Sequence, residues 1–224
     1  MKICVIGTGY VGLVSGACFS DLGNIVHCVD KNIEKIHMLN QGSIPIFEPG
    51  LEEMVKKNYK DKRLIFTTDL KKAVIYSDII FICVGTPTIK NSNSVNLKYV
   101  FKAVKDIRKY IKKFKIIITK STIPVATGDK IEKMINSKVK RKLFEVVSNP
   151  EFLREGDAIR DFRYPDRIVI GTDNKKVINI LADLYDPIIK KGAIYLATSR
   201  KGAELIKYAS NAFLATKITY INEI

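Results

Sequence analysis

A turn built on three glycines, Gly7-Thr8-Gly9-Tyr10-Val11-Gly12, joins an apolar segment at residues 2–6 to a helical pattern that continues to about Leu22. Gly7 permits a tight turn, Gly9 lets the backbone approach a pyrophosphate, and Gly12 lets the helix pack on the strand. The N-terminus of that helix offers free N–H groups to an anion. Three glycines alone can mark an ordinary loop, but this order of strand, turn and helix predicts a dinucleotide site.

Asp30 lies at the end of the next predicted strand. A carboxylate in this position accepts hydrogen bonds from the adenosine ribose of a dinucleotide. Its negative charge would repel the 2′-phosphate of NADP, so Asp30 favours NAD as the cofactor. The alternative interpretation is structural, because Asp30 could instead cap a helix that begins near Asn32.

Short apolar runs alternate with helical patterns along most of the chain. The runs that we interpret as buried strands are residues 2–6, 25–29, 64–67, 79–84, 116–119, 145–147, 167–170 and 193–196. Because parallel neighbours need long crossover connections, this alternation predicts an α/β fold with a mostly parallel sheet and helices on both faces. Together with the glycine turn it predicts a Rossmann-like, doubly wound architecture.

The pattern changes near the end of the chain, where apolar residues keep helical spacing from Ala203 to Ile221 with no Gly or Pro between them. No C-cap signal closes this helix before residue 224. We therefore expect a dinucleotide-binding domain over residues 1–198. Residues 199–224 are expected to begin a long connecting helix that is cut before a further domain.

The formal net charge of +15 raises the alternative of a nucleic-acid partner. The lysines, however, are spread along the chain and fall between apolar residues, as in the amphipathic helix predicted at residues 97–114. This pattern is typical of a solvated helix face, so we expect no nucleic-acid partner. No apolar run reaches the roughly 18 residues of a membrane span. We accordingly expect no membrane partner and a cytoplasmic location.

The four cysteines, Cys4, Cys18, Cys28 and Cys83, lack the spacing of metal ligands. Cys4 and Cys83 lie within apolar strand patterns, where a thiol usually packs as a small hydrophobe. We expect structural thiols and no metal site.

A second turn of small residues, Val84-Gly85-Thr86-Pro87, follows the predicted strand at residues 79–83. It would lie at the same carboxyl edge of the sheet as the glycine turn, where open α/β sheets bind ligands. As an isolated tetrapeptide it is equally compatible with an ordinary turn.

Several longer motifs follow one another along the chain: Phe47-Glu48-Pro49-Gly50-Leu51, Lys120-Ser121-Thr122-Ile123-Pro124, residues 149–156 (Asn-Pro-Glu-Phe-Leu-Arg-Glu-Gly) and residues 203–212 (Ala-Glu-Leu-Ile-Lys-Tyr-Ala-Ser-Asn-Ala). With the two glycine-containing turns, they resemble the UDP-glucose 6-dehydrogenase family of nucleotide-sugar dehydrogenases. The resemblance covers essentially all 224 residues. It implies oxidation of C6 of UDP-glucose to a carboxylate in two steps, with NAD as the oxidant and an aldehyde and an enzyme thioester as intermediates.

The resemblance also implies roles for individual residues. Thr122 matches a threonine that holds a catalytic water, and Glu151 matches a glutamate that transfers protons with it. Glu155 matches the second glutamate of that loop. Lys207 matches a lysine that stabilises negative charge at C6, and Asn211 matches its companion near the reacting carbon.

The binding residues implied in the same way fall into two sets. The NAD contacts are Gly7, Gly9, Tyr10, Val11, Gly12, Asp30, Lys35, Gly85, Thr86 and Thr122. The substrate contacts are Glu151, Phe152, Leu153, Arg154, Glu155, Lys207 and Asn211. The resemblance further implies a homodimer formed through the connecting helix.

The chemistry of the residues agrees with these roles without selecting the substrate. Lys207 and Asn211 are four residues apart and share one face of a helix whose neighbouring residues are apolar. A cation held there would stabilise negative charge strongly. The alternative for Lys207 is a side chain that snorkels to solvent. For Glu151 it is an N-cap or a loop salt bridge.

The sequence departs from the family pattern in its cysteines. The family nucleophile is a cysteine in a glycine-rich segment beyond the central helix, and none of the four cysteines here matches it. We therefore expect the chain to hold the NAD site and part of the substrate site without the thioester chemistry. Two alternatives remain open: a sister enzyme acting on GDP-mannose, and a catalytically inactive NAD-binding module.

Overall fold

The computed structural model describes residues 1–92 and 94–224, and an 8-stranded sheet forms its centre. The strands are β1 (Lys2–Ile6), β2 (Ile25–Val29), β3 (Leu64–Thr67), β4 (Ile79–Ile82), β5 (Lys115–Thr119), β6 (Phe144–Ser148), β7 (Arg167–Gly171) and β8 (Ile194–Thr198). Their order across the sheet is β3-β2-β1-β4-β5-β6-β7-β8. The first six strands thus have the order of a doubly wound dinucleotide-binding sheet.

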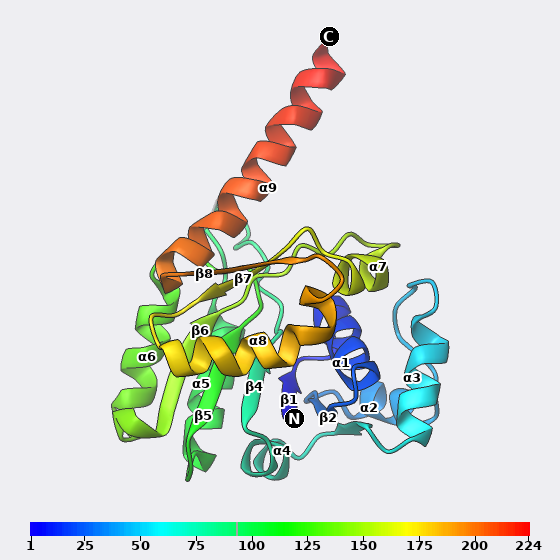
Figure 1. Ribbon diagram of the computed structural model, residues 1–224, viewed down its shortest axis with the longest axis vertical. Helices are drawn as coiled ribbons and strands as arrows, with labels where there is room; N and C mark the ends of the chain where they lie inside the picture. The colour runs from blue at the N-terminus through cyan, green and yellow to red at the C-terminus, as the bar shows by residue number, and fades with distance from the viewer. Residues whose placement is uncertain (93) are drawn as a thin grey trace.

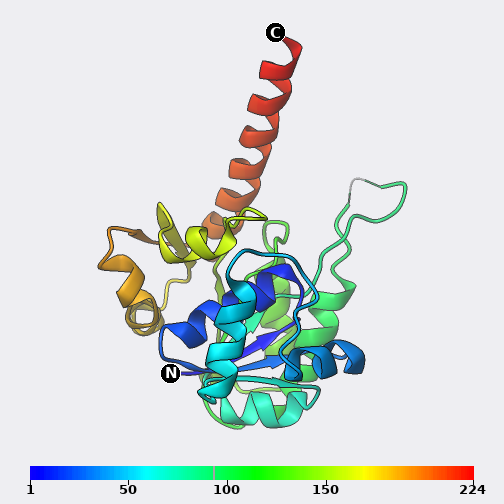
Figure 2. The same ribbon diagram turned by 90° about the vertical axis from the view of Figure 1, so that its right-hand side faces the viewer.

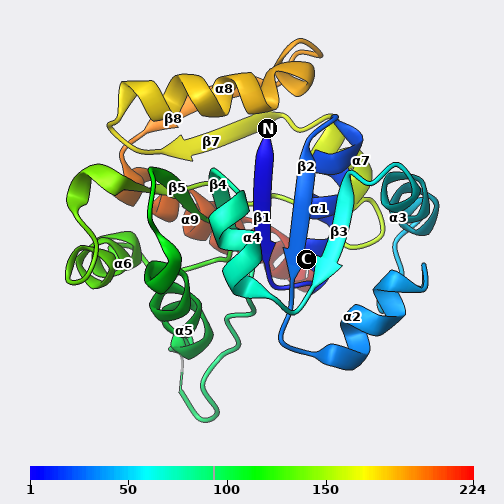
Figure 3. The same ribbon diagram turned by 90° about the horizontal axis from the view of Figure 1, so that it is seen from below.

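Helices cover both faces of the sheet (Figure 1). They are α1 (Tyr10–Asp21), α2 (Ile33–Asn40), α3 (Leu51–Lys60), α4 (Leu70–Tyr76), α5 (Lys98–Ile107), α6 (Thr127–Asn136), α7 (Ala158–Arg163), α8 (Lys175–Ile189) and α9 (Arg200–Glu223). Two short 3-10 helices span Arg108–Tyr110 and Arg141–Leu143. Side chains of α1, α2, α3, α7 and α8 form one hydrophobic core, and those of α4, α5 and α6 form the other. Figure 3 shows the sheet between these two groups.

The central strands are mostly apolar because both of their faces are buried. Along β1, Ile3 and Val5 enter one core, whereas Cys4 and Ile6 enter the other. This alternation follows from the two-residue period of a strand. It explains why the sequence shows continuous apolar runs instead of the apolar and polar alternation of a half-exposed sheet.

The predicted α/β fold with a mostly parallel sheet is confirmed. β1 to β6 pair in parallel. β7, however, runs antiparallel to β6 and pairs with it at Ser148 and Gly171, while β7 and β8 are parallel to each other. β8 is an edge strand and is mostly exposed.

β2 has its predicted limits, Ile25–Val29, and Asp30 directly follows it instead of being its last residue. The predicted ends of several other strands differ from the observed ones by one or two residues. The helix predicted over residues 97–114 ends at Ile107 and continues only as the 3-10 turn Arg108–Tyr110. Ile111 is buried beyond that turn, so its apolar spacing reflects tertiary packing where the chain turns into β5.

α9 leaves the rest of the fold as a projecting helix (Figures 1 and 2). Its first two turns are seated against β6 and β7 and bury Ala203, Glu204 and Lys207. From Asn211 onward its side chains are exposed. The seated portion therefore holds Lys207 against the sheet.

Candidate active site

Four of the predicted functional segments follow four adjacent strands. β1, β4, β5 and β6 lie side by side and run parallel, so their carboxyl ends form one edge of the sheet. The segments that follow them are residues 7–12, 83–87, 120–123 and 149–155. Open α/β sheets bind ligands at this edge. The topology therefore gathers segments that are far apart in sequence into one candidate site.

The glycine turn is closely packed at Gly7 and Gly12. Gly7 has a φ of +98°, and a Cβ added there would lie 2.7 Å from the carbonyl oxygen of Cys83. A Cβ on Gly12 would lie 1.9 Å from the carbonyl oxygen of Gly7. Only glycine fits at either position without moving backbone atoms.

Gly9 differs from its two neighbours because the space around it is open. It is the N-cap of α1, with φ −72° and ψ −169°, and a Cβ there would meet no heavy atom within 4 Å. Since glycine has no side chain to cap the helix, the first N–H groups of α1, including that of Val11, remain for an anion. This open cradle fits the pyrophosphate of a dinucleotide.

The Asp30 carboxylate is tied to the glycine turn. Its Oδ2 accepts hydrogen bonds from the Thr8 backbone N–H at 2.9 Å and the Thr8 hydroxyl at 2.8 Å, and Oδ1 accepts one from the Asn32 N–H at 3.1 Å. Burial raises the pKa of Asp30, but these hydrogen bonds and the nearby Lys35 outweigh it and hold the pKa below its usual value. The carboxylate is ionised at neutral pH, and Oδ1 keeps an acceptor site for a hydroxyl group.

The helix cap near Asp30 is Asn32. The Asn32 side-chain oxygen accepts the Lys35 backbone N–H at 3.0 Å, so Asp30 does not cap α2 and the structural alternative for it was wrong. The Lys35 side chain reaches back toward the turn, with its Nζ 3.8 Å from Asp30 Oδ2. Asp30 and Lys35 thus lie together beside the glycine turn.

Hydrogen bonds join the small-residue turn after β4 to the segment after β5. The Thr86 hydroxyl donates to the Thr122 carbonyl oxygen at 3.0 Å, and the Ser121 hydroxyl donates to the Val84 carbonyl oxygen at 2.6 Å. Gly85 is exposed at the tip of this turn. The turn is therefore held against the Thr122 segment.

Lys207 and Glu151 form a buried ion pair. Their Nζ and Oε1 atoms are 2.9 Å apart, and the two side chains keep only 8% and 12% of their accessible surface. Glu151 Oε2 also accepts the Leu153 N–H at 2.7 Å, and Lys207 Nζ lies 5.2 Å from the centre of the Phe152 ring. Lys207 is thus no snorkelling side chain, whereas Glu151 makes the loop contacts that its structural interpretation predicts. At such depth the attraction between charges is strong.

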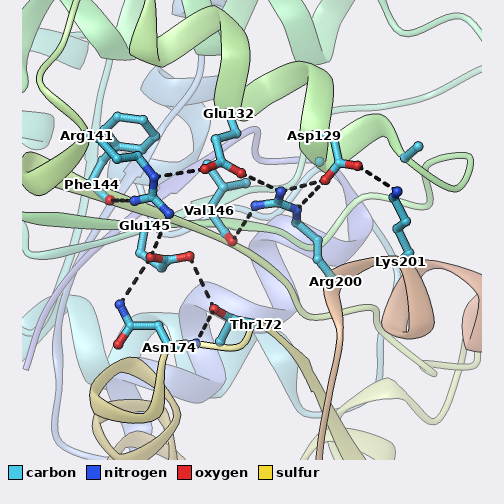
Figure 4. A network of polar contacts seen from close by, with 12 residues as sticks. Asp129, Glu132, Arg141, Phe144, Glu145, Val146, Thr172, Asn174, Arg200 and Lys201 are labelled. Atoms are coloured by element: carbon cyan, nitrogen blue, oxygen red, sulfur yellow. Dashed lines mark hydrogen bonds and ion pairs between the residues drawn. The ribbon is translucent and has the colours of Figure 1, made fainter.

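The base of α9 is fixed by a polar network that continues into the neighbouring elements (Figure 4). Arg200 bonds Asp129 at 2.6 Å, Glu132, and the Val146 carbonyl oxygen at 3.2 Å. Arg141 extends the network to Glu145, which accepts hydrogen bonds from Thr172 and Asn174. The network ties α9 to α6, β6 and the start of α8, and so sets where Lys207 points.

A second anchor of α9 is Glu204. Its buried carboxylate accepts the backbone N–H groups of Ala126 at 2.6 Å and Gly128 at 2.8 Å, at the N-terminus of α6. Burial raises the pKa of Glu204, against the effect of these hydrogen bonds. Because α6 follows the Thr122 segment, Glu204 aligns that segment with the turn of α9 that carries Lys207.

The other predicted residues of this site are more exposed. Asn211 lies one turn beyond Lys207 on α9 and is exposed, as is Glu155. The Arg154 guanidinium turns toward α7, where it pairs with Asp161 at 2.6 Å and Asp157 at 3.0 Å. The structure thus brings Glu151, Phe152 and Lys207 into contact and leaves Arg154, Glu155 and Asn211 at the surface.

Lys120 is a charged residue for which the sequence suggested no role. It is 5% exposed, and its Nζ donates to Asn149 Oδ1 at 3.3 Å, an atom that also accepts the Tyr185 hydroxyl at 2.6 Å. Burial lowers the pKa of Lys120. Lys120, Asn149 and Glu151 help to line a cavity of about 40 Å³. The only signal in the sequence was its place directly after an apolar strand, which does not identify the partners of Lys120.

The four thiols are free and buried. Burial raises the pKa of Cys18 and of Cys83 to about 12, and it raises the pKa values of Cys4 and Cys28 as well. A thiolate is the nucleophilic form of cysteine. None of these four side chains supplies one at neutral pH.

Two further findings concern only the residues that the structure describes. Across residues 1–92 and 94–224, no helix is both long and apolar enough to cross a membrane. Within the same ranges, no three His, Cys, Asp or Glu side chains are grouped so that they could hold a metal ion.

The sheet order, the open helix N-terminus and the acidic residue after β2 define a dinucleotide-binding protein of the Rossmann type. Within that class, the chain belongs to the UDP-glucose/GDP-mannose dehydrogenase family, as its sequence motifs indicated. Residues 1–189 match the NAD-binding domain of the family, and residues 201–224 match its central domain. NAD is therefore the cofactor of this domain.

Individual relatives extend this finding. The chain is 51% identical to UDP-glucose 6-dehydrogenase of Rhizobium meliloti and 50% identical to UDP-glucose 6-dehydrogenase TuaD of Bacillus subtilis, over 100% of its own length and 52% and 48% of theirs. Among solved structures it resembles a GDP-mannose dehydrogenase from Pseudomonas aeruginosa (TM-score 0.95, 38% identity, 100% of this chain and 52% of that one). A UDP-glucose dehydrogenase from Pyrobaculum islandicum is similar (TM-score 0.93, 38% identity, 99% and 51%). The chain spans about half the length of the curated relatives it matches.

Proposed function

We propose that these residues form the NAD-binding part of an enzyme that oxidises UDP-glucose to UDP-glucuronate through two hydride transfers from C6. The observation that carries this proposal is the buried pair of Lys207 and Glu151 at the sheet edge where the glycine turn opens. The proposed substrate is supported by relatives of 50% and 51% identity, which are UDP-glucose 6-dehydrogenases.

The cofactor site in this proposal is the edge formed after β1, β2, β4 and β5. Gly7, Gly9, Tyr10, Val11 and Gly12 would hold the pyrophosphate, Asp30 and Lys35 the adenosine ribose, and Gly85, Thr86 and Thr122 the nicotinamide side. When bound, NAD supplies the hydride acceptor. The main support is chemical: an uncapped helix N-terminus suits a pyrophosphate, and an ionised Asp30 suits ribose hydroxyls.

The proposed chemistry uses the buried charges. Lys207 stabilises negative charge on the oxygen at C6, and Asn211, one turn further along α9, donates a hydrogen bond from the same helix face. Glu151 accepts the proton of the C6 hydroxyl, and the Thr122 hydroxyl holds a water beside it. The ion pair of Lys207 and Glu151 holds both side chains together and largely out of solvent at the place where these steps occur.

The substrate loop is proposed to bind mainly through its backbone. Arg154 is held toward α7 by Asp157 and Asp161, which bind its Nε and one terminal nitrogen of its guanidinium. The backbone groups of residues 152–155 then remain for the substrate, with Glu155 as the exposed acidic side chain of the loop.

The thioester step requires a nucleophile that the four buried thiols do not provide. We propose that it comes from the length that the relatives have and this chain does not span. The purified 224 residues should therefore bind NAD without forming UDP-glucuronate.

The test is NADH formation by these residues joined to the remaining length of the TuaD relative. UDP-glucose should be oxidised with two NADH per sugar. Lys207→Ala should reduce kcat by at least about a hundredfold, with little change in NAD affinity. Unchanged turnover in Lys207→Ala would remove this lysine from the mechanism.

Two other functions each have one supporting observation. Oxidation of GDP-mannose is supported by the likeness to a GDP-mannose dehydrogenase, and offering both sugars to the joined protein separates the two substrates. An inactive NAD-binding module is supported by the four unreactive thiols. That function requires the joined protein to bind NAD and oxidise neither sugar.

We further propose a division into residues 1–198 and 199–224, and a homodimer formed through α9. The exposed apolar side chains of Phe213, Leu214, Ile218 and Ile221 support the dimer. A cytoplasmic location is supported by four free cysteines, because disulfides are rare in that compartment.

A further inference from the structure

Glu48 lies between the glycine turn and the substrate loop. It belongs to the segment between α2 and α3 and is 4% exposed. Its Oε1 accepts the Ala158 backbone N–H at 2.8 Å, and its Oε2 accepts the Gly156 backbone N–H at 2.9 Å. One carboxylate thus fixes the end of the 152–156 loop and the first residue of α7.

The same carboxylate is bonded to the glycine turn. The Tyr10 hydroxyl donates to Glu48 Oε2 and accepts the Gly156 N–H at 3.1 Å. Tyr10 is the first residue of α1 and directly follows Gly9. A continuous set of hydrogen bonds therefore runs from the cofactor turn through Tyr10 and Glu48 to Gly156 and Ala158.

These bonds are strong because Glu48 is ionised. Burial raises the pKa of Glu48, but the bonds from Tyr10, Gly156 and Ala158 outweigh it and hold the pKa below its usual value. Burial and the neighbouring Glu48 raise the pKa of Tyr10, so its hydroxyl keeps the proton that it donates. Charge-assisted hydrogen bonds are shorter and about twice as strong as neutral ones.

We propose that Glu48 is a positioning residue that couples the cofactor turn to the substrate loop. An anion at the N-terminus of α1 orders the first turn of that helix, including Tyr10. Tyr10 then fixes Glu48, and Glu48 fixes the backbone of residues 152–156. This inference rests on the proposed function, because it assigns the cofactor to the turn and the substrate to the loop. Since coupling is reciprocal, an ordered loop also favours the cofactor.

Amide hydrogen exchange, measured by NMR on the 224-residue chain, tests the coupling at its own donor atoms. In the wild type, saturating NAD should slow exchange of the Gly156 and Ala158 amides by about fivefold or more. Tyr10→Phe removes the hydroxyl that joins turn and loop, so the slowing should disappear once saturation is verified by titration. Glu48→Gln replaces one acceptor by an amide donor. Exchange at both amides should then rise without NAD, and the response to NAD should be lost.

Two matched variants control for general loosening of the fold. Tyr195→Phe removes another tyrosine hydrogen bond, to the Ile178 carbonyl oxygen, and Glu52→Gln changes an exposed glutamate four residues from Glu48. Both should keep the full response to NAD. Retention of that response in Tyr10→Phe, or unchanged exchange in Glu48→Gln without NAD, would overturn the proposal. If the wild type binds NAD but exchange of the two amides does not slow, only the coupling is contradicted. If the chain does not bind NAD, the proposed function is contradicted as well.

Discussion

At the scale of single residues, the pairing of Lys207 with Glu151 makes a prediction about stability. Lys207→Met leaves the Glu151 carboxylate buried without its cation, so the free energy of unfolding should fall by about 3 kcal/mol. Lys217→Met changes a lysine on the exposed part of the same helix and should have little effect. Urea unfolding of both variants measures the difference. If Lys207→Met is as stable as Lys217→Met, then removing Lys207 does not leave a buried charge on Glu151, and the prediction is wrong.

Asp30 makes a prediction about cofactor choice. Its ionised carboxylate lies beside Thr8 and the open helix N-terminus, so a 2′-phosphate placed there meets like charge. The chain should bind NAD at least about tenfold more tightly than NADP, and Asp30→Ala should remove most of that preference. Calorimetric titration with both cofactors measures it. Equal affinity of the wild type for NAD and NADP would contradict this role of Asp30.

Lys115 makes a prediction about pH. It is fully buried in β5, where its ammonium donates to the carbonyl oxygens of Ile75 and Ser77, and burial lowers its pKa to about 8 from 10.5. Above pH 8 the folded chain therefore loses a proton that the unfolded chain still holds, and stability rises with pH. Between pH 7 and 9 the wild type should gain about 1 kcal/mol relative to Lys115→Met. A stability difference that does not change with pH would contradict the lowered pKa.

The sequence predicted those site residues whose roles depend on residues nearby along the chain. The three glycines, Asp30, and the shared helix face of Lys207 and Asn211 all follow from spacing along the chain. Lys120 and Glu204 could not be assigned in this way, because their partners lie on other elements: Asn149 for Lys120, and the N-terminus of α6 for Glu204. A pattern along the chain does not show which distant backbone N–H groups a carboxylate will meet.

Among the helices and strands, the attachment of α9 to α6 and β6 depends on Arg200. This side chain is largely buried and binds two carboxylates, whereas its neighbour Lys201 pairs with Asp129 while 61% exposed. Arg200→Met should lower the free energy of unfolding by about 2 kcal/mol, and Lys201→Met by less than about 1 kcal/mol. Thermal or urea unfolding separates the two variants. If Lys201→Met lowers the free energy of unfolding more than Arg200→Met does, Arg200 is not the residue that attaches α9 to the fold.

Element boundaries were predicted well for strands and less well for helices. Strands here are continuous apolar runs between polar turns, so their limits are visible in the sequence. Beyond α5, Ile111 is buried by tertiary contacts while the chain is no longer α-helical, and its spacing imitates a longer helix. The spacing of apolar residues indicates which residues are buried, and a helix is only inferred from that burial.

At the scale of the whole molecule, the mostly parallel sheet followed from the alternation of strands and helices. The reversal between β6 and β7 did not, because strand direction leaves no trace in apolar periodicity. The connection between them carries the substrate loop and α7, which crosses to the α1 face of the sheet. This reversed connection brings Gly156 and Ala158 to Glu48 and Tyr10.

Calorimetric titration of the 224 residues with NAD tests whether the glycine turn is the cofactor site. The wild type should bind one NAD per chain. Gly9→Val should abolish binding while the chain still folds, because a Cβ there meets no heavy atom of the protein within 4 Å and the rest of the side chain extends into the cradle. A wild type that does not bind NAD, or a Gly9→Val variant that binds it equally well, would show that the glycine turn is not the cofactor site.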